Sequence, residues 1–141
     1  MAASLTPQQV DRLLAAARDA QLRAHAPYSR FRVGAAVLDE SGRIHAGCNV
    51  ENAAYPLGMC AEALAIATMV REGGRSVAGL VVVGEGERLV TPCGGCRQRL
   101  AEFAAPGTKV HMVSPAGRVL LSTTLAVLLP HAFGPINLRR S

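Results

Sequence analysis

The chain lacks long apolar runs, a secretory leader pattern and a good supply of aromatic rings. None of its windows approaches the roughly 18 consecutive apolar residues that a membrane-spanning helix needs, so we expect no membrane partner. Its first ten residues contain neither the basic stretch nor the apolar core of a secretory signal, which favours a cytoplasmic location. Only 4% of the residues are aromatic and none is tryptophan, so few rings are present to stack on nucleic-acid bases.

The sequence also lacks clusters of positive charge, although its net charge is +5. The arginines occur singly between Arg12 and Arg118, and only Arg139 and Arg140 are adjacent. Recognition of nucleic-acid phosphates needs cations gathered on one surface. We therefore expect a solvated, mixed-charge surface rather than a nucleic-acid partner.

What the chain does contain is enough apolar sequence for one folded core. It has 141 residues, of which 50% are hydrophobic, and this suits one globular domain better than a disordered chain. No repeat, linker or low-complexity run divides it. We therefore expect residues 1–141 to form a single domain.

Hydrophobic periodicity predicts helices and strands in alternation. Helices are predicted at residues 5–24, 60–70, 92–103 and 124–129, and strands at residues 33–38, 43–48, 77–83 and 109–113. Thr6 and Pro7 supply an N-cap and a first-turn proline for the first helix. Because such an alternation gives a sheet covered on both faces, we predict an α/β fold, a three-layer α/β/α sandwich with a mixed central sheet. The strand order stays open.

Three of the four cysteines fall at the starts of predicted helices. Cys60 opens one helix, and Cys93 and Cys96 lie three residues apart in the first turn of another, on one face. Helix N-termini favour the thiolate form, which is the form that binds metals. Three thiolates suit one Zn²⁺ whose fourth position is left for water, which is the pattern of a catalytic zinc site.

Glu62 indicates the chemistry of such a site. It stands two residues after Cys60, a rotation of roughly 200° around a helix, so it is poorly placed as a fellow ligand. A carboxylate that borders the open position can move a proton from water to a leaving group. Cys48 ends a predicted strand, where it is either a buried free thiol or a fourth ligand that closes a structural zinc site. The histidines have no spacing partners and are expected in structural or surface positions: His25, His45, His111 and His131.

Two motifs, Cys60-Ala61-Glu62 and Pro92-Cys93-Gly94-Gly95-Cys96, resemble those of the zinc nucleoside deaminases. Three further segments, residues 28–36, 49–55 and 128–135, are similar to the small, all-cysteine cytidine deaminase family, so the resemblance spans nearly the whole chain. It implies zinc-dependent hydrolytic deamination of cytidine, and of 2′-deoxycytidine, to uridine or deoxyuridine and ammonia. It also implies a role in pyrimidine salvage.

The resemblance assigns roles to individual residues. It implies that Cys60, Cys93 and Cys96 hold one zinc ion and that Glu62 shuttles protons. It assigns the substrate pocket to six residues: Phe31, Asn49, Glu51, Tyr55, Ala61 and Phe133. Within this set the resemblance gives the ribose hydroxyls to Asn49 and Glu51, which alternate along an extended segment and so project to one side. Phe133 is implied to come from a neighbouring subunit, which makes the enzyme a homo-oligomer, in this family usually a homotetramer.

One position departs from the family pattern. Many members carry an arginine directly after the motif glutamate, whereas this chain has Ala63. Zinc with three thiolates carries a formal charge of −1, so the loss of a nearby cation matters. Arg97, directly after Cys96, matches a second arginine of the family, and we expect it to hydrogen-bond a thiolate sulfur.

Three other functions stay open at this point. A deaminase of the blasticidin type shares the two cysteine motifs, although residues 49–55 favour cytidine. The charge of +5 leaves a nucleic-acid-editing deaminase as another reading. The third is a non-catalytic zinc module in which Cys48 is the fourth ligand.

Overall fold

A computed structural model describes residues 4–139 of the chain. Residues 1–3 and 140–141, and with them Arg140 and both ends of the predicted domain, lie outside this range. The elements are α1 (Pro7–Leu22), β1 (Gly34–Asp39), β2 (Ile44–Cys48), η1 (Tyr55–Leu57), α2 (Ala61–Arg71), β3 (Val77–Val83), α3 (Gly94–Phe103), β4 (Ala104–Val113), β5 (Val119–Thr124), α4 (Leu125–Leu128) and η2 (Pro135–Leu138). Within the described range, no helix combines the length and apolarity that crossing a membrane requires.

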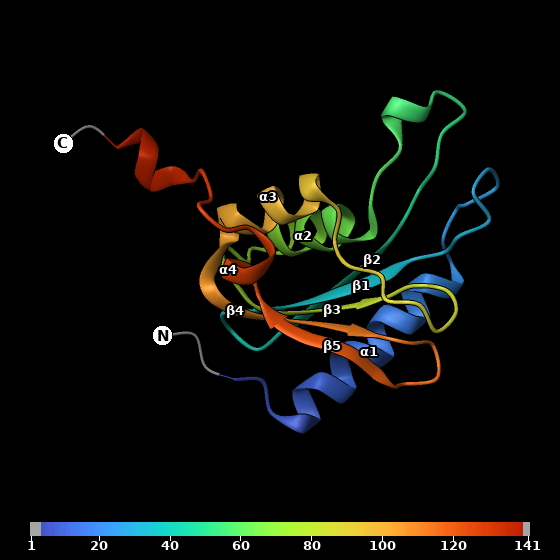
Figure 1. Ribbon diagram of the computed structural model, residues 1–141, viewed down its shortest axis with the longest axis horizontal. Coiled ribbons are helices and arrows are strands. Elements are labelled where there is room, and N and C mark those ends of the chain that lie inside the picture. Colours follow the sequence, from blue (N-terminus) through green and yellow to red (C-terminus); the bar gives the residue numbers. More distant parts are fainter. Residues whose placement is uncertain (1–3, 140–141) are drawn as a thin grey trace.

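One five-stranded sheet forms the middle layer, in the order β2-β1-β3-β4-β5. Strands β3 and β4 are parallel, and the other neighbouring pairs are antiparallel. Helix α1 covers one face of the sheet, and α2, α3 and α4 cover the other (Figure 1). The predicted three-layer sandwich with a mixed sheet is therefore confirmed.

The two covered faces explain why β3 and residues 34–38 of β1 contain no polar side chain. In β1, Ala35 and Val37 pack in the core beneath α2, whereas Ala36 and Leu38 pack on the opposite side with Leu13 of α1. Successive side chains of a strand point to opposite faces, so a strand buried on both sides has no polar face to show. The expected buried strands are thus confirmed.

The predicted helices and strands are present, but the sequence-based prediction missed one strand. No element is predicted between residues 113 and 124, whereas residues 119–124 form β5 at the edge of the sheet. This strand is largely exposed, and its apolar residues come first and its polar ones last, so it shows no alternation. Strand β4 also begins earlier than predicted, because Ala104 already pairs with Val77 ahead of a register shift.

Gly47 of β2 lets α2 pack directly on the sheet. A Cβ atom at this position would lie only 2.6 Å from the carbonyl oxygen of Ala61, in the first turn of α2. A larger residue would push this turn away from the strand. The close approach therefore fixes the position of the segment that carries Cys60 and Glu62.

Asp39, at the end of β1, is a buried anchor for the β1–β2 turn. Its carboxylate accepts hydrogen bonds from the backbone N–H groups of Ser41 and Arg43, each at 2.9 Å, and from Nε of Arg43 at 2.9 Å. Nε2 of His45 lies 2.8 Å from the same carboxylate. Burial opposes ionisation, yet hydrogen bonds from His45, Ser41 and Arg43 together hold the pKa of Asp39 well below its usual value.

We expect D39N to lower the free energy of unfolding by about 2 kcal/mol at pH 7, because it removes a buried carboxylate that accepts hydrogen bonds from Ser41 and Arg43. The amide would also point an N–H₂ group at Nε of Arg43. Because the folded pKa lies below the unfolded value near 3.9, the stabilisation is present above that pH and is lost as the pH falls toward the folded pKa. The difference in the free energy of unfolding between wild type and D39N, measured by urea denaturation, should therefore be smaller at pH 3 than at pH 7.

The control for this prediction is D19N, at the exposed Asp19–Arg23 pair of α1. Its effect should stay within about 1 kcal/mol of zero, as for exposed ion pairs in general. If wild type and D39N differed by the same free energy of unfolding at both pH values, the pH-linked role of Asp39 would be contradicted.

Candidate active site

Three cysteines converge where the first turns of α2 and α3 meet. Cys60 is the N-cap of α2, Cys93 is the N-cap of α3, and Cys96 lies in the first turn of α3. Their Sγ atoms lie within 4.8 Å of one another, and those of Cys60 and Cys93 are 3.7 Å apart. Two sulfur ligands about 2.3 Å from a tetrahedral zinc lie about 3.8 Å apart, so this donor set fits one zinc ion.

Cys48 does not belong to this cluster. Over residues 4–139 the potential metal-ligand group comprises Cys60, Cys93 and Cys96, with no fourth side chain. Cys48 is half-buried at the end of β2, where burial raises the pKa of its thiol. The alternative of a closed four-cysteine zinc site is therefore wrong for this structure.

The pKa values of the three thiols are shifted in different directions by their surroundings. A backbone hydrogen bond from Cys96 is the main cause that lowers the pKa of Cys93, whereas burial raises the pKa of Cys60 and that of Cys96. Thiolates are the metal ligands, so zinc binding here includes the loss of thiol protons.

Glu62 is buried beside the cysteines, in the first turn of α2. Only 5% of its surface is exposed, and burial is the main cause that raises its pKa, opposed in part by Cys96 and by the charge of Arg99. It lines the same cavity as Cys60 and Cys93 without joining the metal-ligand group. Its side chain therefore borders the cavity beside two of the cysteines, where it can exchange a proton with a bound molecule.

This cavity has a volume of about 360 Å³ and reaches from the cysteines to the segment after β2. It brings together most of the residues that the sequence singled out: Asn49, Glu51, Tyr55, Cys60, Ala61, Glu62 and Cys93. Val33, Met59 and Thr91 line it as well, and the sequence-based reasoning did not identify these as site residues. One cavity thus contains the polar residues Asn49 and Glu51 as well as the metal-ligating cysteines Cys60 and Cys93.

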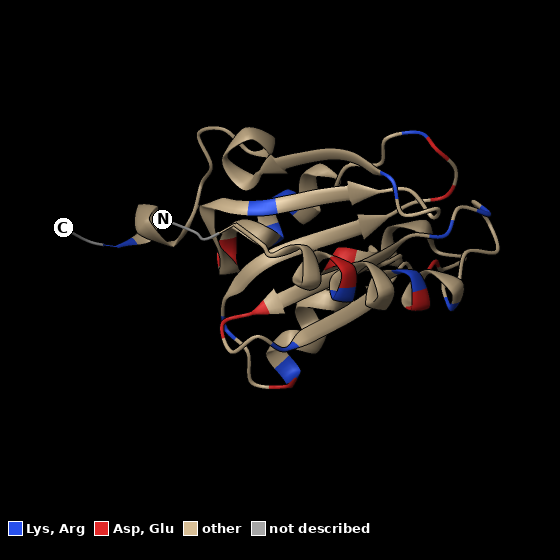
Figure 2. Ribbon diagram, turned by 90° about the horizontal axis from the view of Figure 1, so that it is seen from below, with Lys and Arg blue, Asp and Glu red and all other residues tan. Residues whose placement is uncertain are grey.

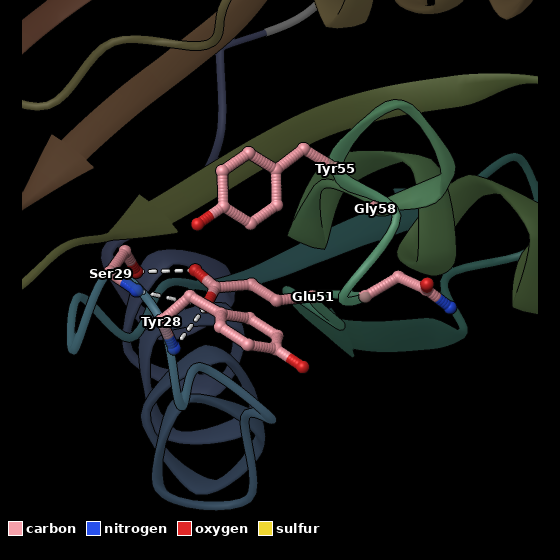
Figure 3. A pocket seen from close by; sticks show the side chains of 6 residues that line it. Tyr28, Ser29, Glu51, Tyr55 and Gly58 are labelled. Atoms are coloured by element: carbon pink, nitrogen blue, oxygen red, sulfur yellow. Dashed lines mark hydrogen bonds between the residues drawn. The ribbon is translucent and has the colours of Figure 1, made fainter.

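Glu51 also lines a neighbouring pocket, in which hydrogen bonds hold its carboxylate (Figure 3). The backbone N–H groups of Tyr28 and Ser29 each donate to it at 3.0 Å, and the hydroxyl of Ser29 donates to its other oxygen. The hydroxyl hydrogen bond is the main cause that lowers the pKa of Glu51. Tyr55 and Tyr28 lie close to this carboxylate, with ring centroids 5.8 Å apart. Tyr28 and Ser29 lie in a family-like segment, a signal that could have identified them.

Asn49 fastens the segment that precedes β1. Its Oδ1 accepts from the N–H of Val33 at 2.8 Å, and its Nδ2 donates to the carbonyl of Phe31 at 2.8 Å. An amide side chain has two hydrogens and two lone pairs, so one of each stays free for a ligand. Phe31 is 38% exposed, and it is not among the residues that line the cavity.

Comparison with known proteins identifies the group to which this site belongs. The family described as the cytidine and deoxycytidylate deaminase zinc-binding region matches residues 7–112. The chain belongs to this deaminase family. The resemblance drawn from the cysteine motifs is thereby confirmed, as is zinc as the cofactor that the family binds.

Individual deaminases of the family are similar over most of their length. A cytidine deaminase of Sporosarcina psychrophila is 44% identical over 129 residues, which cover 92% of this chain and 94% of the relative. The crystal structure of cytidine deaminase from Burkholderia pseudomallei has a TM-score of 0.82 at 40% identity, and the match covers 92% of this chain and 100% of that one. The cytidine deaminase structure from Mycobacterium tuberculosis has a TM-score of 0.75 at 39% identity, covering 88% and 96% of the two chains.

The structure corrects the expected contact of Arg97 in this deaminase. Its guanidinium donates to the carbonyl of Pro92 at 2.7 Å, to the carbonyl of Leu128 at 2.8 Å and to the hydroxyl of Thr91 at 3.1 Å. These hydrogen bonds connect the loop before Cys93 to α4. All three acceptors are oxygen atoms, and none is a cysteine sulfur. The arginine beside a sulfur is Arg99, which the sequence-based reasoning missed although it stands one helical turn after Cys96.

Phe133 lies apart from the cavity of its own chain. It is 58% exposed and follows α4 in the C-terminal segment, which projects away from the sandwich (Figure 1). Its carbonyl accepts a hydrogen bond from the side chain of Gln98 at 2.8 Å. Within one chain of this deaminase, therefore, the ring of Phe133 does not contribute to the site.

Proposed function

We propose that the chain is a cytidine deaminase that converts cytidine and 2′-deoxycytidine, with water, to uridine or deoxyuridine and ammonia. The observation that carries this proposal is the single cavity that joins the cysteine cluster and Glu62 to Asn49 and Glu51. The first group suits hydrolysis at a ring carbon, and the second suits a sugar. Full-length relatives that are cytidine deaminases support the same substrate.

The mechanism assigns the proton transfers to Glu62. When bound by Cys60, Cys93 and Cys96, zinc supplies the Lewis acid that makes water nucleophilic near neutral pH. Glu62 takes a proton from water and gives it to N3 of the pyrimidine as C4 gains the hydroxyl oxygen. It then moves the hydroxyl proton to the amino nitrogen, so that the C4–N bond breaks and ammonia leaves. One buried carboxyl group thus serves both steps.

The sugar is proposed to bind at the other end of the cavity. Asn49 keeps one amide hydrogen and one lone pair free after it has fastened residues 31–33. Glu51 is pre-oriented by three hydrogen bonds from Tyr28 and Ser29 and, as an ionised carboxylate, accepts hydrogen bonds from hydroxyl groups. Ala61, almost fully buried at the first position of α2, offers a backbone contact to the base.

A free nucleoside suits this site better than a polynucleotide. Lysines and arginines are interspersed with acidic residues over the elements and do not gather on one surface in Figure 2. Several arginines pair with carboxylates, as Arg32 does with Glu85 and Arg118 with Glu87. Such pairs leave less positive charge for phosphate groups.

The test is the change in ultraviolet absorbance when purified zinc-loaded protein is mixed with cytidine. We expect conversion to uridine, and a parallel conversion of 2′-deoxycytidine. Activity on a blasticidin-type compound and none on cytidine would reassign the substrate. Activity on single-stranded RNA alone, with binding that weakens steeply as salt increases, would point to a nucleic-acid deaminase.

We also propose a homotetramer in which Phe133 completes the site of a neighbouring subunit. Large apolar side chains are exposed on α4 and in the segment beyond it, namely Val127, Phe133, Ile136 and Leu138. Burial of such a surface between subunits is a common reason for its exposure in one chain. Light scattering should then give four times the mass of one chain.

F133A should raise KM for cytidine about 5-fold, since the loss of one aromatic contact with a ring is worth about 1 kcal/mol. Because the ring is proposed to act in the neighbouring site, mixed tetramers of F133A and E62Q should contain some sites with both Glu62 and Phe133. Those sites should restore the low KM, as measured in steady-state assays of subunits mixed under reversible dissociation. Mixed tetramers that keep the high KM would contradict donation between subunits.

A cytoplasmic location and a role in pyrimidine salvage complete the proposal. All four cysteines are free thiols in the structure, and a reducing compartment keeps such thiols available for zinc. Deamination of a free nucleoside yields uridine, which suits the reuse of pyrimidines. Fractionation of cells that express the tagged protein would test the location.

A further inference from the structure

Neither of two positions next to the proposed zinc site donates a hydrogen bond to its cysteine sulfurs. Three thiolates and Zn²⁺ together carry a formal charge of −1. Ala63, directly after Glu62, has a side chain with neither a charge nor a hydrogen-bond donor. Arg97 is engaged by the carbonyls of Pro92 and Leu128 and by Thr91. The next arginine along α3 that could provide such a hydrogen bond is Arg99.

Arg99 reaches back over the first turn of α3 to the cysteines. Its Nη1 lies 3.7 Å from Sγ of Cys96, within the range of a hydrogen bond to sulfur. Residues three apart share a helix face, and helical side chains lean toward the N-terminus, so this contact follows from the spacing. The guanidinium, unlike a lysine ammonium, remains charged at every relevant pH.

Gly95 leaves the space in which the guanidinium lies. A Cβ atom at position 95 would lie 3.2 Å from Nη1 of Arg99 and 4.0 Å from Sγ of Cys93. The arginine and a second cysteine sulfur therefore both lie beside Gly95. Arg99 is placed to act on the negative charge of the whole cluster, and not on Cys96 alone.

We propose that Arg99 is a positioning residue of the zinc site. Its guanidinium donates to the thiolate of Cys96 and offsets the net negative charge of the zinc cluster, a task for which position 63 has no cation in this chain. The inference rests on the proposed deaminase only through its zinc site. It makes two predictions, one for zinc affinity and one for the electronic state of the sulfur.

The first measurement is the zinc dissociation constant, obtained by competition with a chromogenic chelator. R99A should bind zinc about 10- to 100-fold more weakly than wild type, which is the usual loss when an outer hydrogen-bond partner of a metal ligand is removed. R99K keeps the charge without the planar fork and should fall between the two. The matched control is R71A, which removes the same charge from the far end of α2 and should leave zinc affinity unchanged.

The second measurement is the sulfur-to-metal charge-transfer absorption of the Co²⁺-substituted protein. Removal of a donor makes the thiolate a better electron donor, so the band of R99A should move to lower energy, whereas that of R71A should not move. Unchanged zinc affinity in R99A would overturn the proposal. Weaker affinity with an unmoved band would also overturn it, because the arginine would then act on the helix rather than on sulfur. Neither measurement uses a nucleoside, so a wrong substrate assignment would leave both readouts intact.

Discussion

E62Q is expected to reduce kcat for cytidine by about 10³-fold, in the middle of the range for the loss of a general acid and base. The substitution keeps the size of the side chain but removes its ability to take up a proton from water. Glu62 is 5% exposed and lines the cavity together with Cys60 and Cys93. The carboxylate of Glu51, which lines the same cavity, accepts three hydrogen bonds from Tyr28 and Ser29, so we do not expect it to replace Glu62.

Steady-state rates and zinc content should be measured together for this variant. Zinc should stay near one ion per chain, because Glu62 lies outside the ligand group. The matched control is E72Q, the same substitution at the C-cap of α2, which should keep wild-type activity. Wild-type kcat in E62Q at full zinc occupancy would show that Glu62 is not the proton carrier.

The same site shows what could be predicted from sequence and what could not. Cys60, Cys93 and Glu62 were predictable because their positions relative to helix starts are local, and local spacing fixes the side on which a side chain emerges. The partner of Arg97 was not predictable in this way. Its hydrogen bond to the carbonyl of Leu128 joins residues 31 positions apart, and the packing of α4 on α3 decides it.

The same distinction between local sequence signals and long-range contacts applies to the fold. Strands β1 and β3 were evident because burial on both faces leaves a continuous apolar run. Strand β5 was missed because an edge strand is held by its pairing with β4, and this pairing leaves little hydrophobic signal in the sequence. The strand order depends on contacts between distant segments, so it became known only from the structure.

C93A is expected to remove zinc and, with it, all measurable deamination. Loss of an outer partner of a zinc ligand weakens binding about 10- to 100-fold, and loss of one of three ligands should weaken it further. Cys93 is the most informative position because its side chain is exposed, so its removal leaves no buried cavity. Cys96 is fully buried, and its replacement would combine a metal effect with a packing effect.

The matched control is C48A, which removes the cysteine that lies outside the cluster. Zinc per chain, measured by mass spectrometry of the metal, should fall close to zero in C93A and stay near one in C48A, while both variants keep the wild-type circular dichroism spectrum. The two outcomes separate the readings of the cysteines. Zinc loss in C48A would restore the closed four-cysteine site, and retained zinc in C93A would mean that the metal binds elsewhere. Zinc loss in C93A together with retained zinc in C48A indicates the three-thiolate site, because Cys93 is a ligand there and Cys48 is not.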